Sequence, residues 1–187
     1  MSTMKSNPTE YFLLPAEIAL TSKDVETLWS MRPASPHQIK FFGKLIDTPR
    51  LQQAYGKDYK FSGTVSRGIP IPAFLKPLMS YLNDRLGVNT NMLLVNWYRD
   101  GDDYISMHSD DEKQVKANTP VITVSFGATR DFVLKNKTTK ERIVVPVENN
   151  SVLVMKPGCQ QTHTHGVPVR KKVKDYRISV TLREFFD

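Results

Sequence analysis

The sequence predicts an α+β protein built on a jelly-roll core. Six short runs rich in Val, Ile and aromatic residues lie in the second half of the chain, at 91–98, 121–127, 130–135, 142–147, 151–156 and 177–185. Turn-forming pairs such as Asp100-Gly101 and Pro157-Gly158 separate these runs. Strands at this spacing are typical of an antiparallel barrel or sandwich. We therefore expect a double-stranded β-helix with N-terminal helices packed on its outside.

The first half of the chain supplies the helices. Residues 73–86 predict one helix, which Pro77 begins or kinks and Gly87 ends. From Pro33 to Pro72 the chain lacks helical periodicity, which indicates short strands and loops. An earlier helix is predicted over residues 15–31, where apolar side chains share one face: Ile18, Leu20, Val25, Leu28 and Trp29.

The length indicates one domain. The 187 residues are enough for a full hydrophobic core, and no repeat or linker divides them, so we treat 1–187 as a unit. Residues 1–10 are polar and predict a disordered tail, and residues 88–187 predict the jelly-roll core. We expect the protein to be a monomer.

Charge and cysteine content narrow the classes of partner. Lys and Arg number 26 against 19 Asp and Glu, giving a net charge of +7, which favours a polyanion but also fits a merely basic protein. The single cysteine, Cys159, allows no intrachain disulfide and suits a reducing, intracellular compartment. That means the nucleus in a eukaryote or the cytoplasm in a bacterium. The apolar runs are too short to cross a membrane.

A metal site is the first functional candidate. In an extended segment, His108 and Asp110 point the same way and can present an imidazole and a carboxylate to one point. Either His163 or His165, far along the chain, can supply a third ligand. Two imidazoles and one carboxylate leave three positions open on an octahedral ion, which suits non-haem iron(II) oxygenases. A zinc site, or a surface ion pair between His108 and Asp110, remains open at this level.

The last predicted strand carries the second signal. Arg177, Ser179, Thr181 and Arg183 fall on one face, opposite the apolar side chains between them. Guanidinium groups on the inner face of a barrel need an anionic partner, which a dicarboxylate supplies. The competing interpretation is an exposed strand whose arginines pair with Asp or Glu.

Together these features resemble the AlkB family of iron(II)- and 2-oxoglutarate-dependent dioxygenases, over roughly residues 37–185. The motifs that carry the resemblance are Asn96-Trp97-Tyr98, residues 108–112, residues 120–130, His165-Gly166-Val167-Pro168 and residues 177–183. Within the family the chain looks closest to the homologue that repairs alkylated double-stranded DNA. The pieces behind that narrower match are Phe41-Phe42-Gly43, residues 49–56, residues 59–63 and residues 169–172.

The resemblance implies a role for each residue that matches a family motif. His108, Asp110 and His165 should bind Fe(II), which favours His165 over His163. Arg177 should hold the distal carboxylate of 2-oxoglutarate, and Arg183 should lie near its metal-chelating end. The remaining contacts to 2-oxoglutarate are expected from Asn96, Tyr98 and Thr181. Ser179 stands where the family often has Asn, so one contact there is lost or passes through water.

The resemblance also implies a substrate side, in a nucleotide-recognition lid over residues 37–72. Tyr59 and Phe61 should stack on a flipped base with His108, with Ser62 lining the same pocket. Phe42, or its neighbour Phe41, should enter the vacated stack. Asp111 or Glu112 should bond the exocyclic amine of the base. Backbone phosphates should be held by Arg50, Arg170, Lys171 and Lys172. Without the resemblance, the aromatic residues read as core and the basic run as a solvated loop.

These expectations define a function. The chain should demethylate N-alkylated bases such as 1-methyladenine and 3-methylcytosine in double-stranded DNA, using Fe(II), O₂ and 2-oxoglutarate for direct repair. A dioxygenase of the same fold acting on RNA or protein is the first alternative. A non-catalytic nucleic-acid binder is the second, and a metal enzyme without 2-oxoglutarate is a third that leaves Arg177 and Arg183 without a purpose.

Overall fold

The computed structural model describes residues 7–186, and residues 1–6 of the expected tail lie outside this range. The end of the expected tail is ordered instead. Thr9 and Glu10 begin strand β1 (Thr9–Leu13), whose residues pair with Met155 to Ser151 of β13. The tail prediction for these two residues was wrong, because backbone pairing at a sheet edge needs no apolar sequence signal.

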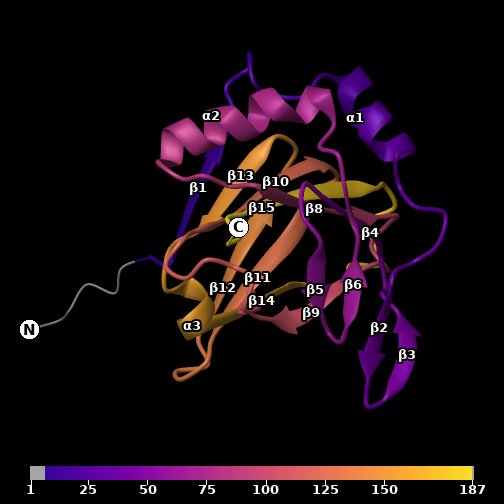
Figure 1. Cartoon of the computed structure of the whole chain (residues 1–187), viewed down its shortest axis with the longest axis vertical. Helices are drawn as coiled ribbons and strands as arrows, with labels where there is room; N and C mark the ends of the chain where they lie inside the picture. Colours follow the sequence, from indigo (N-terminus) through magenta and orange to yellow (C-terminus); the bar gives the residue numbers. More distant parts are fainter. Residues whose placement is uncertain (1–6, 187) are drawn as a thin grey trace, which may run out of the picture.

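Two sheets form the body of the protein (Figure 1). The larger has the order β1-β13-β10-β15-β8-β4-β7 and is antiparallel except for the pair β4 and β7. Its remaining strands are β13 (Ser151–Met155), β10 (Val121–Gly127), β15 (Arg177–Arg183), β8 (Met92–Tyr98), β4 (Leu51–Tyr55) and β7 (Gly68–Ile69). The smaller, fully antiparallel sheet consists of β12 (Arg142–Val147), β11 (Arg130–Asn136), β14 (His163–Val167) and β9 (Ile105–His108). The α+β prediction is confirmed.

Two helices cover the outer face of the larger sheet. Helix α1 (Ser22–Ser30) begins later than the predicted residue 15, because Thr21 and Asp24 form a capping box there. Helix α2 (Lys76–Leu86) follows a short 3₁₀ turn, η1 (Ala73–Leu75), and ends as predicted at Gly87, which has a φ of 63°. Leu28 and Leu82 from these helices pack with apolar side chains of the sheet, and Figure 1 shows both helices on one side of it.

The two faces of β15 differ, which positions the site. Val180 and Leu182 join the core beneath the helices, as predicted. A second apolar cluster lies between the two sheets and combines residues such as Leu153 of β13 with Leu134 of β11 and Val167 of β14. Alternate residues of β15 therefore face into the space between the sheets, where their polar side chains line one end of the interior.

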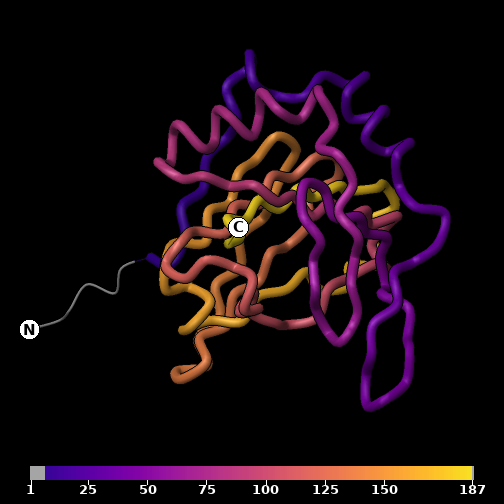
Figure 2. The backbone as a smooth tube through the Cα atoms, in the orientation of Figure 1, coloured from indigo at the N-terminus to yellow at the C-terminus, as the bar shows by residue number. Residues whose placement is uncertain are grey.

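Two hairpins stand beside that end of the molecule (Figure 2). One joins β2 (Gln38–Phe41) to β3 (Lys44–Asp47), and the other joins β5 (Tyr59–Phe61) to β6 (Thr64–Ser66). Both turns use positive φ at a non-glycine residue, 46° at Phe42 and 46° at Ser62, each followed by glycine. The Lys40 amide donates to the Ser62 carbonyl at 3.0 Å and ties the hairpins together.

Membrane-spanning helices are not found among residues 7–186. None of the helices there is long and apolar enough to cross a bilayer.

Candidate metal centre

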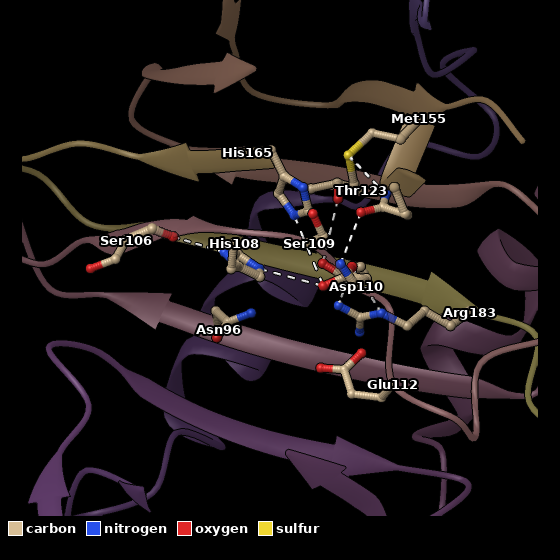
Figure 3. A network of polar contacts seen from close by, with 12 residues as sticks. Asn96, Ser106, His108, Ser109, Asp110, Glu112, Thr123, Met155, His165 and Arg183 are labelled. Atoms are coloured by element: carbon tan, nitrogen blue, oxygen red, sulfur yellow. Dashed lines mark hydrogen bonds and ion pairs between the residues drawn. The ribbon is translucent and has the colours of Figure 1, made fainter. Parts of the chain in front are cut away.

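The three predicted ligands meet at one point. His108 and His165 are register partners on β9 and β14, and Asp110 lies two residues past His108. The ligand atoms lie within 4.8 Å of one another. The Asp110 Oδ1 atom is 3.4 Å from His108 Nε2 and 3.9 Å from His165 Nε2 (Figure 3). Pairing across the sheet therefore brings together residues that are far apart in the sequence.

Asp110 presents one occupied oxygen and one open oxygen. Its Oδ2 atom accepts hydrogen bonds from Arg183, at 3.1 Å from Nε and 2.7 Å from Nη2. Its Oδ1 atom is buried and has no hydrogen-bond partner. Burial pushes the pKa of Asp110 upward, but the Arg183 guanidinium, together with His108 and His165, holds the pKa well below the usual range. An ionised, buried oxygen aimed between two imidazoles is what a divalent cation requires.

Both imidazoles are prepared as ligands. His108 Nδ1 lies 2.8 Å from the Ser106 carbonyl, so this nitrogen carries the proton and Nε2 is left as a lone-pair donor. Burial lowers the pKa of His165 to about 3, which keeps its ring neutral. His163 has a different role, since its Nδ1 atom contacts the Thr162 hydroxyl at 2.8 Å. The structure thus agrees with the choice of His165, and burial of Asp110 excludes a surface ion pair.

A cavity of about 750 Å³ contains this centre. Its lining includes all three ligands and every residue predicted to contact the cosubstrate: Asn96, Tyr98, Arg177, Ser179, Thr181 and Arg183. Thr181 lies opposite Thr123 on β10, with their hydroxyl oxygens 3.5 Å apart. Ser179 and Asn96 are register partners on β15 and β8. Polar side chains of three neighbouring strands, β10, β15 and β8, therefore line the cavity that holds the metal ligands.

Arg177 is the group in this cavity that most needs a partner. Its side chain is 1% exposed, and only Nη2 has a hydrogen bond, donated to Ser125 Oγ at 2.8 Å. Its Nε and Nη1 atoms are buried without partners, and the guanidinium lies 5.1 Å from the Tyr98 ring centroid. A buried guanidinium with two unpaired donors fits a carboxylate. The residues present therefore fit a dicarboxylate cosubstrate beside the metal.

The predicted base-binding residues reach the mouth of the same cavity. Tyr59, Phe61, Ser62, Asp111 and Glu112 all belong to its lining. The Tyr59 hydroxyl donates to Glu112 Oε1 at 2.7 Å, and the rings of Tyr59 and Phe61 stack with centroids 4.7 Å apart. Burial, and then the neighbouring Asp110 charge, raise the pKa of Glu112.

The predicted DNA-backbone and wedge residues are not brought to the cavity together. Phe42 is 91% exposed at the tip of the β2–β3 hairpin. Lys171 and Lys172 are exposed in the loop after β14, and Arg170 pairs there with Asp131 at 2.6 Å. Arg50 was predicted to contact a backbone phosphate, but its side chain is buried in the cavity.

Arg50 lines the cavity and is only 6% exposed. Its Nε atom donates to Asn96 Oδ1 at 2.7 Å, and its Nη2 atom donates to Gln52. Arg50 therefore orients a predicted cosubstrate residue from inside, and this place does not support a phosphate contact. The motif match gave its position in the family but not the direction of its side chain.

Sequence reasoning missed two polar residues that the structure connects to the site. Ser125 on β10 is the partner of Arg177, and Gln160 accepts from the Asp110 amide at 2.9 Å. Ser125 had a usable signal, because the polar residues of β10 alternate with apolar ones. Gln160 lies in helix α3 (Cys159–Thr162), where no spacing rule applies.

Comparisons with known proteins agree with this geometry. The 2OG-Fe(II) oxygenase superfamily model matches residues 19–183. DNA oxidative demethylase ALKBH2 of Homo sapiens is 34% identical over 158 residues, or 79% of this chain and 60% of that protein. Alpha-ketoglutarate-dependent dioxygenase alkB homolog 3 of Rattus norvegicus is 32% identical over 152 residues, or 74% of this chain and 50% of that protein.

A solved structure supports the fold as well. The structure of OsALKBH1 superposes with a TM-score of 0.64 at 15% identity, covering 95% of this chain and 96% of that chain. At this identity the likeness concerns the fold alone. The chain spans between 57% and 66% of the length of three mammalian ALKBH2 proteins.

The fold and site define a mononuclear non-haem metal centre beside a dicarboxylate pocket. Because the family model covers most of the sequence, the chain belongs to the 2OG-Fe(II) oxygenase superfamily and, by its ALKBH2 and alkB homolog 3 relatives, to the AlkB family. The predicted cofactors, Fe(II) and 2-oxoglutarate, and the predicted dioxygenase class are thereby confirmed.

Proposed function

We propose that this protein removes N-alkyl groups oxidatively from bases such as 1-methyladenine and 3-methylcytosine in double-stranded DNA. One observation carries the proposal. The cavity that holds His108, Asp110 and His165 is also lined by stacked aromatic rings and by the carboxylates of Asp111 and Glu112. A flipped base needs both a flat apolar surface and hydrogen-bond acceptors for its exocyclic amine.

The proposal includes the arrangement of the chain. The two facing sheets over residues 88–187 serve as a double-stranded β-helix, residues 37–72 serve as a nucleotide-recognition lid, and residues 1–187 act as one monomeric domain. An intracellular location, in a nucleus or in bacterial cytoplasm, accompanies a DNA substrate. The net charge of +7 supports a polyanionic partner, because phosphate contacts release counterions.

In the proposed reaction the residues of the chain bind, orient and exclude water. Fe(II), 2-oxoglutarate and O₂ supply the oxidising power that hydroxylates the N-methyl group, and the resulting hemiaminal releases formaldehyde. Arg177 holds the far carboxylate of 2-oxoglutarate through its unpaired N–H groups. Arg183 fixes Asp110 by its occupied oxygen and leaves the other oxygen to the metal.

Recognition of the base is assigned to the mouth of the cavity. Tyr59 holds the Glu112 carboxylate through a 2.7 Å hydrogen bond, which leaves Glu112 Oε2, buried and without a partner, as an acceptor for an amine. Arg183 lies 5.0 Å from the Tyr59 ring centroid and limits movement of that ring. The exocyclic amine of a methylated adenine or cytosine would supply the donor that Glu112 Oε2 lacks.

A substrate panel tests the proposal. Anaerobic loading with Fe(II), followed by 2-oxoglutarate, O₂ and a methylated oligonucleotide, should release formaldehyde in proportion to repaired base. Single-stranded DNA, duplex DNA and RNA carrying the same lesion should be compared in one assay, and we expect turnover on duplex DNA. Turnover on RNA alone would reject the DNA assignment, and 2-oxoglutarate consumption with none of the three would reject a nucleic-acid substrate.

The exposed hairpin gives a prediction about strand preference. Replacing Phe42 by alanine should lower turnover on duplex DNA by roughly tenfold and change single-strand turnover little, because an apolar wedge offsets the cost of unstacking. Leu13→Ala, at another exposed apolar side chain on the edge strand β1, is the control. Equal loss on duplex and single strands would contradict the role of Phe42 as a wedge.

A further inference from the structure

Gln160 contacts the backbone of a metal ligand. It lies in α3, five residues before His165, and its side chain is buried. Its Oε1 atom accepts a 2.9 Å hydrogen bond from the Asp110 amide. Asp110 lies beyond the last register pair of β9 and β14, so sheet pairing does not fix its backbone. The bond from the Asp110 amide to the Gln160 side chain restrains this backbone instead.

The orientation of the Gln160 amide follows from this contact. Its Nε2 atom faces Met155 Sδ at 3.4 Å, and a thioether is a weak acceptor. Turning the amide over would place two N–H donors against each other and leave Oε1 against sulfur. In the observed orientation Nε2 has only the weak acceptor Met155 Sδ, because Oε1 is bonded to the Asp110 amide.

One further bond joins the same two segments, because Ser109 Oγ donates to the His163 carbonyl at 2.9 Å. Lys137 Nζ, from the turn after β11, donates to the Gln160 carbonyl at 2.7 Å and ties α3 to a third segment. Figure 3 shows Ser109 and Asp110 between His165 and Arg183. The segment that carries His165 therefore also holds the segment that carries Asp110.

A competing arrangement explains why this restraint is needed. Arg183 Nη1 and Asp110 Oδ1 are both buried without partners, while the remaining atoms of the pair are bonded. A small shift of the Asp110 backbone would let both of its oxygens pair with Arg183 in the two-pronged geometry that guanidinium and carboxylate prefer. Such a pairing would withdraw Oδ1 from the metal. A fixed backbone at Asp110 prevents it.

We propose that Gln160 is a positioning residue for the metal centre, which holds Asp110 Oδ1 between the two imidazoles before the ion binds. The residue acts through Asp110 and does not itself ligate the metal. The inference concerns the metal site and does not depend on the choice of nucleic acid. Hydrogen-bond partners of metal ligands typically contribute roughly 10–100-fold to metal affinity.

Metal titration of the full chain tests the role of Gln160. Gln160→Met keeps the length of the side chain and removes the acceptor. Its affinity for Mn(II), measured by electron paramagnetic resonance without 2-oxoglutarate, O₂ or DNA, should fall by roughly 10–100-fold. Gln161→Met makes the same change at the exposed neighbour and should stay within about threefold of wild type.

Two further measurements separate positioning from packing. Hydrogen exchange at the Asp110 amide of the metal-free protein should become at least roughly tenfold faster in Gln160→Met and stay unchanged in Gln161→Met. Gln160→Glu, which keeps an oxygen acceptor, should stay within about threefold of wild-type Mn(II) affinity. Wild-type affinity in folded Gln160→Met, or equal losses in the methionine and glutamate variants, would overturn the proposal.

Discussion

Replacing Asp110 with asparagine is expected to abolish formaldehyde release, with a loss of at least about 10³-fold, because the reaction depends wholly on the bound metal. Asparagine keeps the shape of the side chain but removes the negative charge that the cation requires. The metal-free protein should also lose about 3 kcal/mol of unfolding free energy, because Arg183 stays buried without an anionic partner. Activity and stability should both fall because Asp110 is a metal ligand and also the partner of buried Arg183, at 2.7 Å.

Three measurements check this result. They are Mn(II) affinity, formaldehyde release and urea unfolding of the metal-free protein. Asp84→Asn makes the same change at an exposed position on α2 and should leave all three within experimental error. Full turnover in Asp110→Asn would remove Asp110 from the ligand set, whereas unchanged stability would show that the pair with Arg183 contributes nothing net to folding.

The same pair sets a direction for the pH dependence of stability. The pKa of Asp110 is lower in the folded than in the unfolded protein, so ionised Asp110 stabilises the fold above the unfolded-state pKa. This contribution should be lost as the pH falls through the folded-state pKa. In Asp110→Asn the corresponding part of the acid dependence should be missing.

Much of the metal centre could be predicted because it follows from local periodicity. Alternation along an extended segment was enough to pair His108 with Asp110 and to place Arg177 and Arg183 on one face. The third ligand needed more, since His163 and His165 also alternate, and only the resemblance favoured His165. The structure gives a physical reason for His165, because His165 lies opposite His108 in the pairing of β14 with β9.

Other parts of the site depend on contacts that no single-sequence rule describes. Gln160 reaches Asp110 across 50 residues of chain, from a turn whose residues show no periodic pattern. Arg50 follows a proline in the bend before β4, and its burial depends on Asn96 as a partner 46 residues away. The N-terminal helix was predicted too long because its apolar residues continue the periodic pattern into the turns that precede the Thr21 cap.

Replacing Arg177 with methionine is the second change expected to have a large effect. The apparent affinity for 2-oxoglutarate should fall by roughly 100-fold, equivalent to about 2.7 kcal/mol, because truncating one partner of a buried charge pair costs about 2–5 kcal/mol. The maximal rate at saturating 2-oxoglutarate should change much less, since Arg177 donates its hydrogen bond to Ser125 and not to a metal ligand. Formaldehyde release measured against 2-oxoglutarate concentration separates the two parameters.

The same variant should be more stable than wild type without 2-oxoglutarate. Two buried N–H donors of Arg177 have no partner, and a methionine of similar length leaves no charge to desolvate. Thermal unfolding of the metal-free protein should therefore occur at a higher temperature. Adding 2-oxoglutarate to the Mn(II)-loaded protein should raise the unfolding midpoint more in wild type than in the variant. Arg142→Met, at an exposed position on β12, should show neither change.

A variant that lost stability and kept its affinity would mean that Arg177 supports the fold and that the carboxylate is bound elsewhere. A variant that gained stability and lost affinity for 2-oxoglutarate would show that Arg177 is kept for binding. Its buried guanidinium lacks partners in the free protein because the carboxylate of 2-oxoglutarate supplies them.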